Sequence, residues 1–238
     1  MSTKKRLTLI TSYLLLAILS FVGVLFESVQ PGKGFNILNP SQFYGVFAII
    51  LFLLTSLYLF FSKKEELPFW LSFALLALVC FGVIEFLLTF LFAFPVFDPS
   101  NDIWESFLTS DALYLGVFVP LLSVLCFLFT PQKQTNIFLS SLLGVVLMFI
   151  YILFALVGFL ALKCDFLPSL LVPYRSVLKP SFFSDSFLGL CYPIYVFILL
   201  SCSYGFALLL EFSKREINLK KSKKNSKTDV ISEENEVI

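Results

Sequence analysis

Residues 68–94 have the sequence PFWLSFALLALVCFGVIEFLLTFLFAF, in which Glu85 is the single charged side chain. The hydrocarbon core of a bilayer is about 30 Å thick and is crossed by about 20 helical residues. This segment is therefore long enough to cross a membrane, and extra apolar length is usually accommodated by tilt. The same pattern recurs along the chain, so the segment indicates the class of the whole protein.

Apolar blocks of this kind dominate the 238 residues, of which 58% are hydrophobic and 14% charged. A typical soluble domain carries about 25% charged residues, and that class is excluded. Lipid tolerates only helices and closed barrels, and the sequence lacks the alternating pattern of barrel strands. We therefore predict an all-α integral membrane protein with six transmembrane helices within residues 1–211. The predicted spans are residues 7–26, 42–61, 68–94, 112–130, 137–162 and 186–210.

The distribution of Lys and Arg predicts the orientation of these spans. With a cytoplasmic N-terminus, four of the 17 basic residues fall in outer segments, namely Lys33, Lys163, Arg175 and Lys179. Cytoplasmic loops carry the excess of basic residues in membrane proteins, so both termini are assigned to the cytoplasm. The first apolar run exceeds the roughly 7–15 residues of a signal-peptide core, and we expect it to be retained. The predicted location is a bacterial plasma membrane.

Residues 212–238 form a separate segment that is first basic and then acidic. Its apolar content is too low for a packed core, and we expect a disordered cytoplasmic tail. A basic cluster beside a span is typical of a collar that contacts anionic lipid headgroups, and a docking site for an anionic partner is the alternative. Aromatic residues are not interleaved with the charges, so nucleic acid is not expected as a partner. The predicted lipid contacts are Lys214, Arg215, Lys220, Lys221, Lys223 and Lys224.

Several catalytic classes lack their residues in this chain. The sequence contains no His, which excludes Ser-His and Cys-His catalysis and the common zinc and haem sites. The five cysteines never form a CxxC motif, and no phosphate-binding glycine loop is present. We therefore predict no cofactor and no metal.

Glu85 is the one ionisable residue well inside a predicted span. It lies roughly 25 Å along the helix from the inner end, at 1.5 Å per residue, and so belongs in the outer part of the bilayer. A carboxyl group at that depth must face the bundle interior, be protonated or be paired. Candidate partners at the same depth are Lys163 and the Tyr and Asn side chains near the outer ends of the second, fourth and sixth spans. Two interpretations remain open: a carboxyl that locks helix packing, and a substrate or proton site.

Two outer connections carry further polar or unusual sequence. Residues 95–111 hold four acidic side chains and no basic one, which favours a solvated acidic loop, with a cation site as the alternative. Residues 163–185 hold three prolines between apolar residues and are predicted to lie on the outer membrane surface as a lid. The acidic residues of the first connection are Asp98, Asp102, Glu105 and Asp111.

Proline and small residues predict local features of the helices. Pro120 and Pro193 each remove a helix hydrogen bond and favour kinks. Small side chains permit close helix approach. The predicted close contacts are at Ser140, Gly144, Ser201, Ser203 and Gly205.

Several local patterns occur in the order of a known family. These patterns are Gly34-Phe35-Asn36-Ile37-Leu38-Asn39-Pro40, Tyr114-Leu115-Gly116-Val117-Phe118-Val119-Pro120, Leu128-Phe129-Thr130-Pro131, Met148-Phe149-Ile150-Tyr151 and Tyr192-Pro193. The chain resembles the six-span bacterial membrane proteins related to the androgen-induced membrane hydrolases, which cleave fatty-acid esters with a Thr and a His. The resemblance implies the same six-span fold.

The chain departs from that family at the two catalytic positions. Asn36 stands where the family has Thr, and Gly116 stands where it has His. The resemblance therefore implies the fold without the hydrolase chemistry. Because the second and fourth spans both start on the outer side, we predict a ligand-binding pocket there, formed by Asn36, Asn39, Glu85 and Asp111.

Three functions remain open from the sequence. The first is a non-catalytic membrane protein that binds a lipid or small solute in the outward pocket. The second is a substrate-binding membrane subunit of a multi-component transporter. The third is a lipid ester hydrolase with an unusual mechanism that uses no His.

Overall fold

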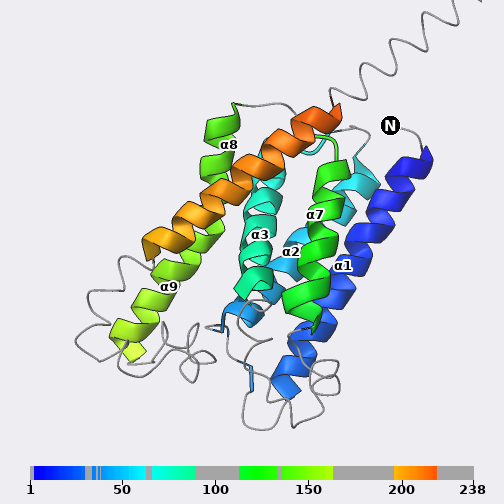
Figure 1. The fold of residues 1–238 in the computed structure, drawn as a ribbon. Helices are drawn as coiled ribbons and strands as arrows, with labels where there is room; N and C mark the ends of the chain where they lie inside the picture. Colours follow the sequence, from blue (N-terminus) through cyan, green and yellow to red (C-terminus); the bar gives the residue numbers. More distant parts are fainter. Residues whose placement is uncertain are drawn as a thin grey trace, which may run out of the picture.

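The computed structural model describes residues 3–29, 34–35, 37, 39–62, 66–88, 113–132, 136–162 and 196–218. Every element in these segments is helical (Figure 1). The elements are α1 (Thr3–Val29), α2 (Pro40–Phe61), α3 (Phe69–Leu88), the π-helical turn η2 (Tyr114–Phe118), α7 (Val119–Phe129), α8 (Ile137–Gly144), α9 (Val146–Leu162) and a C-terminal helix, Val196–Asn218.

Five of these helices are long and apolar enough to cross a membrane. They are Thr3–Val29, Pro40–Phe61, Phe69–Leu87, Ile137–Phe154 and Val196–Asn218. The fourth predicted span corresponds to a shorter apolar helix, Tyr114–Phe129. The predicted all-α class is therefore confirmed for the described residues, and five of the six predicted spans have the expected helix length.

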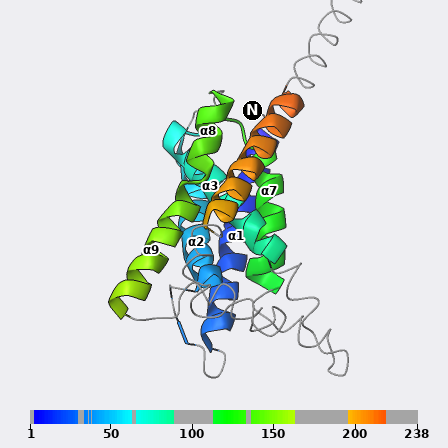
Figure 2. The ribbon, with the colours of Figure 1, turned by 60° about the vertical axis from the view of Figure 1, so that its left-hand side comes forward.

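The helices lie side by side in one bundle, with α3 at its centre (Figures 1 and 2). α1 packs along α2, and α3 contacts α2, α7, α8 and α9. The apolar part of α3 is 67% buried, compared with 39% for α1 and 17% for the C-terminal helix. Glu85 therefore lies on the most enclosed of the long helices.

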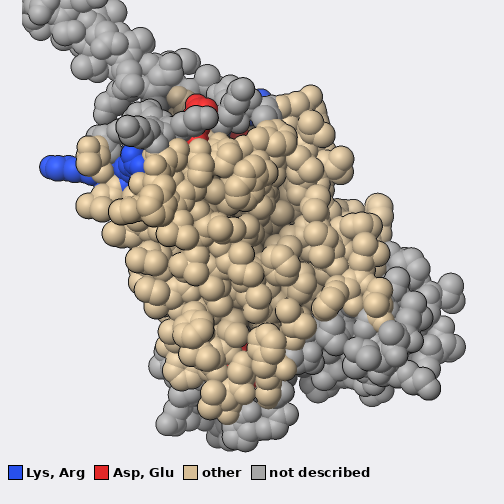
Figure 3. Space-filling model, turned by 180° about the vertical axis from the view of Figure 1, so that it is seen from behind, with Lys and Arg blue, Asp and Glu red and all other residues tan. Residues whose placement is uncertain are grey.

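Large apolar side chains cover the outside of the bundle. Phe21, Phe60, Phe138 and Phe197, from four different helices, are each more than half exposed. Figure 3 shows one face on which uncharged residues form nearly the whole described surface. Soluble monomers rarely expose apolar patches of this extent. The surface is consistent with a protein embedded in a membrane.

Polar side chains define both ends of α2. Asn39 is its N-cap and accepts a hydrogen bond from the Ser41 backbone N–H at 3.3 Å, and Pro40 occupies the first helical position. At the other end, Arg6 of α1 donates to the Leu59 carbonyl at 2.7 Å and also bonds two carbonyls further along. A cation suits this end because helix C-termini carry partial negative charge. Arg6 thus joins the start of α1 to the end of α2.

Two of the predicted spans contain an irregular helical turn, one of them beside a predicted proline kink. Next to Pro120, the chain forms the π-helical turn η2, in which the Val119 N–H bonds the Tyr114 carbonyl. This places an irregularity where the Pro120 kink is predicted, whereas Pro193 lies outside the described residues. The predicted span 137–162 is interrupted at Val145, which separates α8 from α9.

The break at Val145 follows from its local hydrogen bonds. The Val145 N–H bonds the carbonyls of Leu142 and Leu143, a tighter pattern than that of an α-helix. One turn earlier, Ser140 and Ser141 both donate to the Ile137 carbonyl, an arrangement that often bends helices. Sequence hydropathy does not detect such a break because every residue of this turn suits lipid.

Small residues allow one close helix contact of the kind expected from the sequence. A Cβ atom added at Gly144 would lie 2.7 Å from the Ala207 Cβ, so α8 and the C-terminal helix nearly touch there. Ser140 and Ser203 are fully buried. By contrast, a Cβ atom at Gly205 would meet no atom of the described segments within 4 Å. The prediction of close approach is confirmed at Gly144 and is wrong at Gly205.

The C-terminal helix continues past the predicted end of the last span, residue 210, to Asn218. Lys214 is only 4% exposed, and its Nζ lies 4.0 Å from the ring centroid of Phe127 on α7. Lys214 therefore packs against α7 in the bundle, and the contact of the basic cluster with anionic lipid headgroups stays a prediction. The predicted lipid contacts at residues 220–224 lie outside the described residues.

Candidate functional site

Glu85 is buried inside the bundle, with 7% of its surface exposed. It lies on the side of α3 that faces α2 and α7, close to the hydroxyl group of Tyr44. Burial dominates the environment of its carboxyl group, and no Lys or Arg of the described residues is paired with it. Such a carboxyl is costly in a low-dielectric interior unless it has a partner or a proton.

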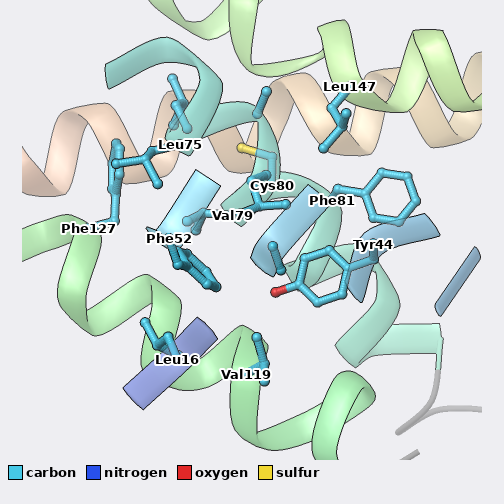
Figure 4. Close-up of a cluster of buried hydrophobic side chains, with 14 of the residues drawn as sticks. Leu16, Tyr44, Phe52, Leu75, Val79, Cys80, Phe81, Val119, Phe127 and Leu147 are labelled. Atoms are coloured by element: carbon cyan, nitrogen blue, oxygen red, sulfur yellow. The ribbon is translucent and has the colours of Figure 1, made fainter. Parts of the chain in front are cut away.

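Tyr44 of α2 places a polar side chain within electrostatic range of Glu85. Its ring is fully buried and stacks on Phe81 at a centroid distance of 5.9 Å. The hydroxyl reaches Gly82, where an added Cβ atom would lie 2.6 Å from the oxygen. Figure 4 shows this hydroxyl pointing into the buried cluster. Glycine at position 82 is therefore what admits the Tyr44 hydroxyl to the Glu85 region.

Ser123 completes this group from α7. It is fully buried and donates a hydrogen bond to the Pro120 carbonyl at 2.7 Å. The Tyr44 hydroxyl lies beside Ser123 and Glu85, but no group of the described residues makes a hydrogen bond of ordinary geometry with it. Three helices thus direct polar side chains to one buried place, and one hydroxyl there lacks a protein partner.

A second polar pair joins α1 and α2 at their linked ends. Glu27 is 1% exposed, and its carboxylate accepts a hydrogen bond from the Asn39 side-chain amide. The neighbouring Gln42 is equally buried and donates to the Gly34 carbonyl at 3.2 Å. These contacts give Asn39 a structural role, because it caps α2 and holds a buried carboxylate of α1.

The four predicted pocket residues have different outcomes. Asn36 and Asp111 lie outside the described residues. Glu85 is buried beside Tyr44, whereas Asn39 contacts Glu27 and Ser41. A pocket shared by all four stays a prediction.

The sequence interpretation missed Glu27 and Ser123 as members of buried polar groups, whereas Tyr44 belongs to the tyrosines expected near Glu85 at the outer end of the second span. Glu27 follows the predicted first span, residues 7–26, by one residue, so the sequence places it outside that span. The available signal for Glu27 is spacing, because Tyr13, Ser20 and Glu27 recur every seven residues and all lie on the buried side of α1. Ser123 gives no comparable signal.

Gly116, which stands where the resembling family keeps its His, is buried within η2. The adjacent Leu115 fills the space beside Gly23 of α1 and Gly45 of α2. Position 116 therefore supplies backbone to a packed turn. Within the described residues, no group of three or more His, Cys, Asp or Glu side chains is arranged to hold a metal ion.

A separate apolar pocket of about 310 Å³ lies between α2, α3 and the α8–α9 pair. Every residue that lines it is apolar. The lining consists of Phe47, Leu51, Phe73, Ala74, Ala77, Leu143, Val146, Leu147 and Ile150. Such a pocket suits a hydrocarbon chain and offers no hydrogen bond to a polar solute.

No protein-family model, curated protein or solved structure matches this chain. The resemblance to the androgen-induced hydrolase relatives therefore stays a prediction.

Proposed function

We propose that this chain is a six-span plasma-membrane protein, with both termini in the cytoplasm, that binds a lipid or small solute at Glu85 without cleaving it. Glu85, Tyr44 and Ser123 form the binding site in the outer half of the membrane. The fourth span contains η2 and α7.

The observation that carries this proposal is that the Tyr44 hydroxyl, beside the buried Glu85 carboxyl, makes no hydrogen bond of ordinary geometry within the described residues. Buried polar groups are nearly always hydrogen-bonded, and an unsatisfied one costs about 1–3 kcal/mol. Ionisable residues inside membrane spans usually mark ligand, ion or proton sites. A bound ligand that meets both groups would remove the cost.

The described residues offer this ligand binding rather than covalent chemistry. Ser123, which lies beside the Tyr44 hydroxyl, already donates to the Pro120 carbonyl. A serine nucleophile needs a base that takes its proton, and histidine is absent from the chain. We therefore assign Glu85 to ligand recognition.

Mass spectrometry of the protein extracted in mild detergent tests the proposal. The wild-type protein should retain a specific lipid or metabolite, and Glu85→Gln should lose it while remaining folded. Glu27→Gln is the matched control, because it neutralises the other buried carboxyl at the Asn39 pair. Equal ligand retention by Glu85→Gln and wild type would contradict the proposal.

Tyr44→Phe separates ligand binding from packing. The substitution removes a buried hydroxyl that lacks a protein partner, so the thermal stability of the ligand-free protein should be unchanged or slightly higher. Ligand retention should fall, because the hydroxyl is assigned to the ligand. A loss of stability without any change in retention would assign Tyr44 to packing alone.

A further inference from the structure

We infer that the ligand of the Glu85 site is a single-chain amphiphile, with an ammonium head group at Glu85 and its hydrocarbon tail in the apolar pocket between α2, α3 and α8–α9. This inference rests on the proposed function and names its ligand class.

The polar site and the apolar pocket lie along the same helices. On α3, Ala74 and Ala77 line the pocket, and Phe81 and Glu85 follow at four-residue steps from Ala77. Residues so spaced share one side of a helix. Eight residues separate Ala77 from Glu85, which corresponds to about 12 Å along the axis. That separation is within the length of an ordinary lipid tail.

Aromatic rings connect the two regions. Phe47 lines the pocket and lies 4.6 Å from Phe43, whose ring is 5.8 Å from that of Phe81. Phe81 in turn stacks on Tyr44, and Figure 4 draws it between Leu147 of the pocket and Tyr44. Aromatic faces attract cations, so these rings also favour an ammonium group beside Glu85.

The chemistry of the head group follows from the carboxyl. Glu85 is buried and no Lys or Arg of the described residues is paired with it, so an ammonium group supplies the missing countercharge. An ammonium group also has several hydrogen-bond donors, one of which suits the unpartnered Tyr44 oxygen.

The order of the two regions matches one leaflet of the membrane. In the proposed topology α3 runs outward from Phe69 to Leu88, so Glu85 lies nearer the outer surface and Ala74 nearer the inner side. A lipid of the outer leaflet has the same order, with its head outside and its tail toward the midplane. The ligand therefore enters without inverting its orientation.

The two parts of the ligand contribute differently to binding. A hydrocarbon chain that leaves lipid for an apolar pocket gains packing contacts but no hydrophobic free energy, because lipid is equally apolar. Binding therefore discriminates between ligands mainly by their head group. The pocket discriminates only between hydrocarbon chains of different shape. An amphiphile with an uncharged head should bind weakly at the same pocket.

Photolabelling in dodecyl maltoside micelles tests the inference. The probe is dodecylamine with a diazirine at the end of its tail, and labelled peptides are identified by mass spectrometry. Wild-type protein should be labelled on α2, α3 and α9 at pocket residues. Glu85→Gln should reduce this labelling about tenfold or more, and Glu27→Gln should leave it unchanged. A probe of equal length with a hydroxyl head should label no better than background.

Pocket-filling variants test the tail separately. Ala77→Phe should abolish labelling at pocket residues, and Ala74→Leu provides a smaller change if the larger side chain prevents folding. Strong labelling by the hydroxyl probe, or labelling that ignores Ala77→Phe and Ala74→Leu, would overturn the inference. The proposed function would survive that result if Glu85→Gln still lost the copurified ligand, and both would fail if Glu85→Gln kept it.

Discussion

Glu27 and Glu85 are both buried carboxyl residues, and their surroundings give them different roles. Glu27 accepts a hydrogen bond from Asn39, a residue that also caps α2. Glu85 lies beside the Tyr44 hydroxyl, which makes no hydrogen bond of ordinary geometry within the described part of the chain. A satisfied polar pair fixes helix positions, whereas an incompletely satisfied one is suited to an exchangeable ligand. The functional assignment therefore depends on partners rather than on burial.

Asn39→Ala should destabilise the protein more than an ordinary N-cap substitution does. The cap is worth about 1 kcal/mol, and the lost donor to the buried Glu27 adds about 1–3 kcal/mol. Asn136→Ala is the matched control, because Asn136 caps α8 through its bond to the Phe138 N–H and has no described bond to a carboxylate. Unfolding in detergent, followed by circular dichroism, measures both losses. Equal losses would show that the Glu27 contact contributes nothing.

The sequence predicts individual residues of this protein unevenly. Glu85 was recognisable because a charged residue inside an apolar run is costly and must be enclosed. Tyr44 is among the tyrosines expected near Glu85 at the outer end of the second span, but the sequence does not single it out, because a tyrosine in a span packs equally well in a core or at an interface. Glu27 lies one residue beyond its apolar run, where hydropathy does not distinguish a buried end from a loop.

At the scale of the helices, Arg6 shows how a charge that predicts orientation also stabilises the fold. Arg6→Ala should lower the unfolding free energy by up to about 2 kcal/mol, because three carbonyls at the end of α2 lose a cationic donor. Lys4→Ala, in the same helix turn, should have a much smaller effect because Lys4 is exposed. Chemical denaturation in detergent compares the two variants. Similar losses of unfolding free energy in the two variants would show that Arg6 does not stabilise the end of α2 and contributes only to membrane orientation.

Two glycines provide a matched pair for testing helix packing. Gly144→Ala places a methyl group 2.7 Å from the Ala207 Cβ, and such overpacking typically costs about 1–3 kcal/mol. Gly205→Ala meets nothing within 4 Å and should be neutral or stabilising, because alanine favours helix by about 1 kcal/mol. Thermal unfolding midpoints measure the contrast. A stabilised Gly144→Ala variant would show that α8 and the C-terminal helix are not in close contact.

Element lengths were largely predictable, but their internal breaks were not. Hydropathy integrates over a whole span, and it correctly indicated helices at α1, α2, α3 and the C-terminal helix. The break at Val145 depends on which carbonyl a single N–H selects. Proline gives a stronger local signal because it removes a donor outright, so the irregularity near Pro120 was foreseeable.

The whole molecule is organised around α3, the most buried of its long helices. A central helix contacts many neighbours, so a polar residue on it receives side chains from several elements at once. Glu85 is placed in this way, with Tyr44 from α2 and Ser123 from α7 nearby. The order of helices along a sequence does not reveal which one is central, and this part of the site could not be predicted.

The membrane topology depends on whether the shorter helix Tyr114–Phe129 belongs to a complete span. Alkaline phosphatase fusions decide this, because the enzyme forms its disulfides only outside the cytoplasm. With six spans, fusions at Asp98 and Lys163 should be active, and fusions at Lys133 and after Ile238 should be inactive.

If residues 112–130 do not cross the membrane, the chain between Asp98 and Lys133 stays on one side, and the fusion at Lys133 becomes active. The C-terminal fusion would then be active as well, and the Lys-rich tail would lie outside against the distribution of basic residues. That outcome would also reverse the predicted direction of α9, whereas the direction of α3, on which the leaflet order of the amphiphile inference depends, would stay the same.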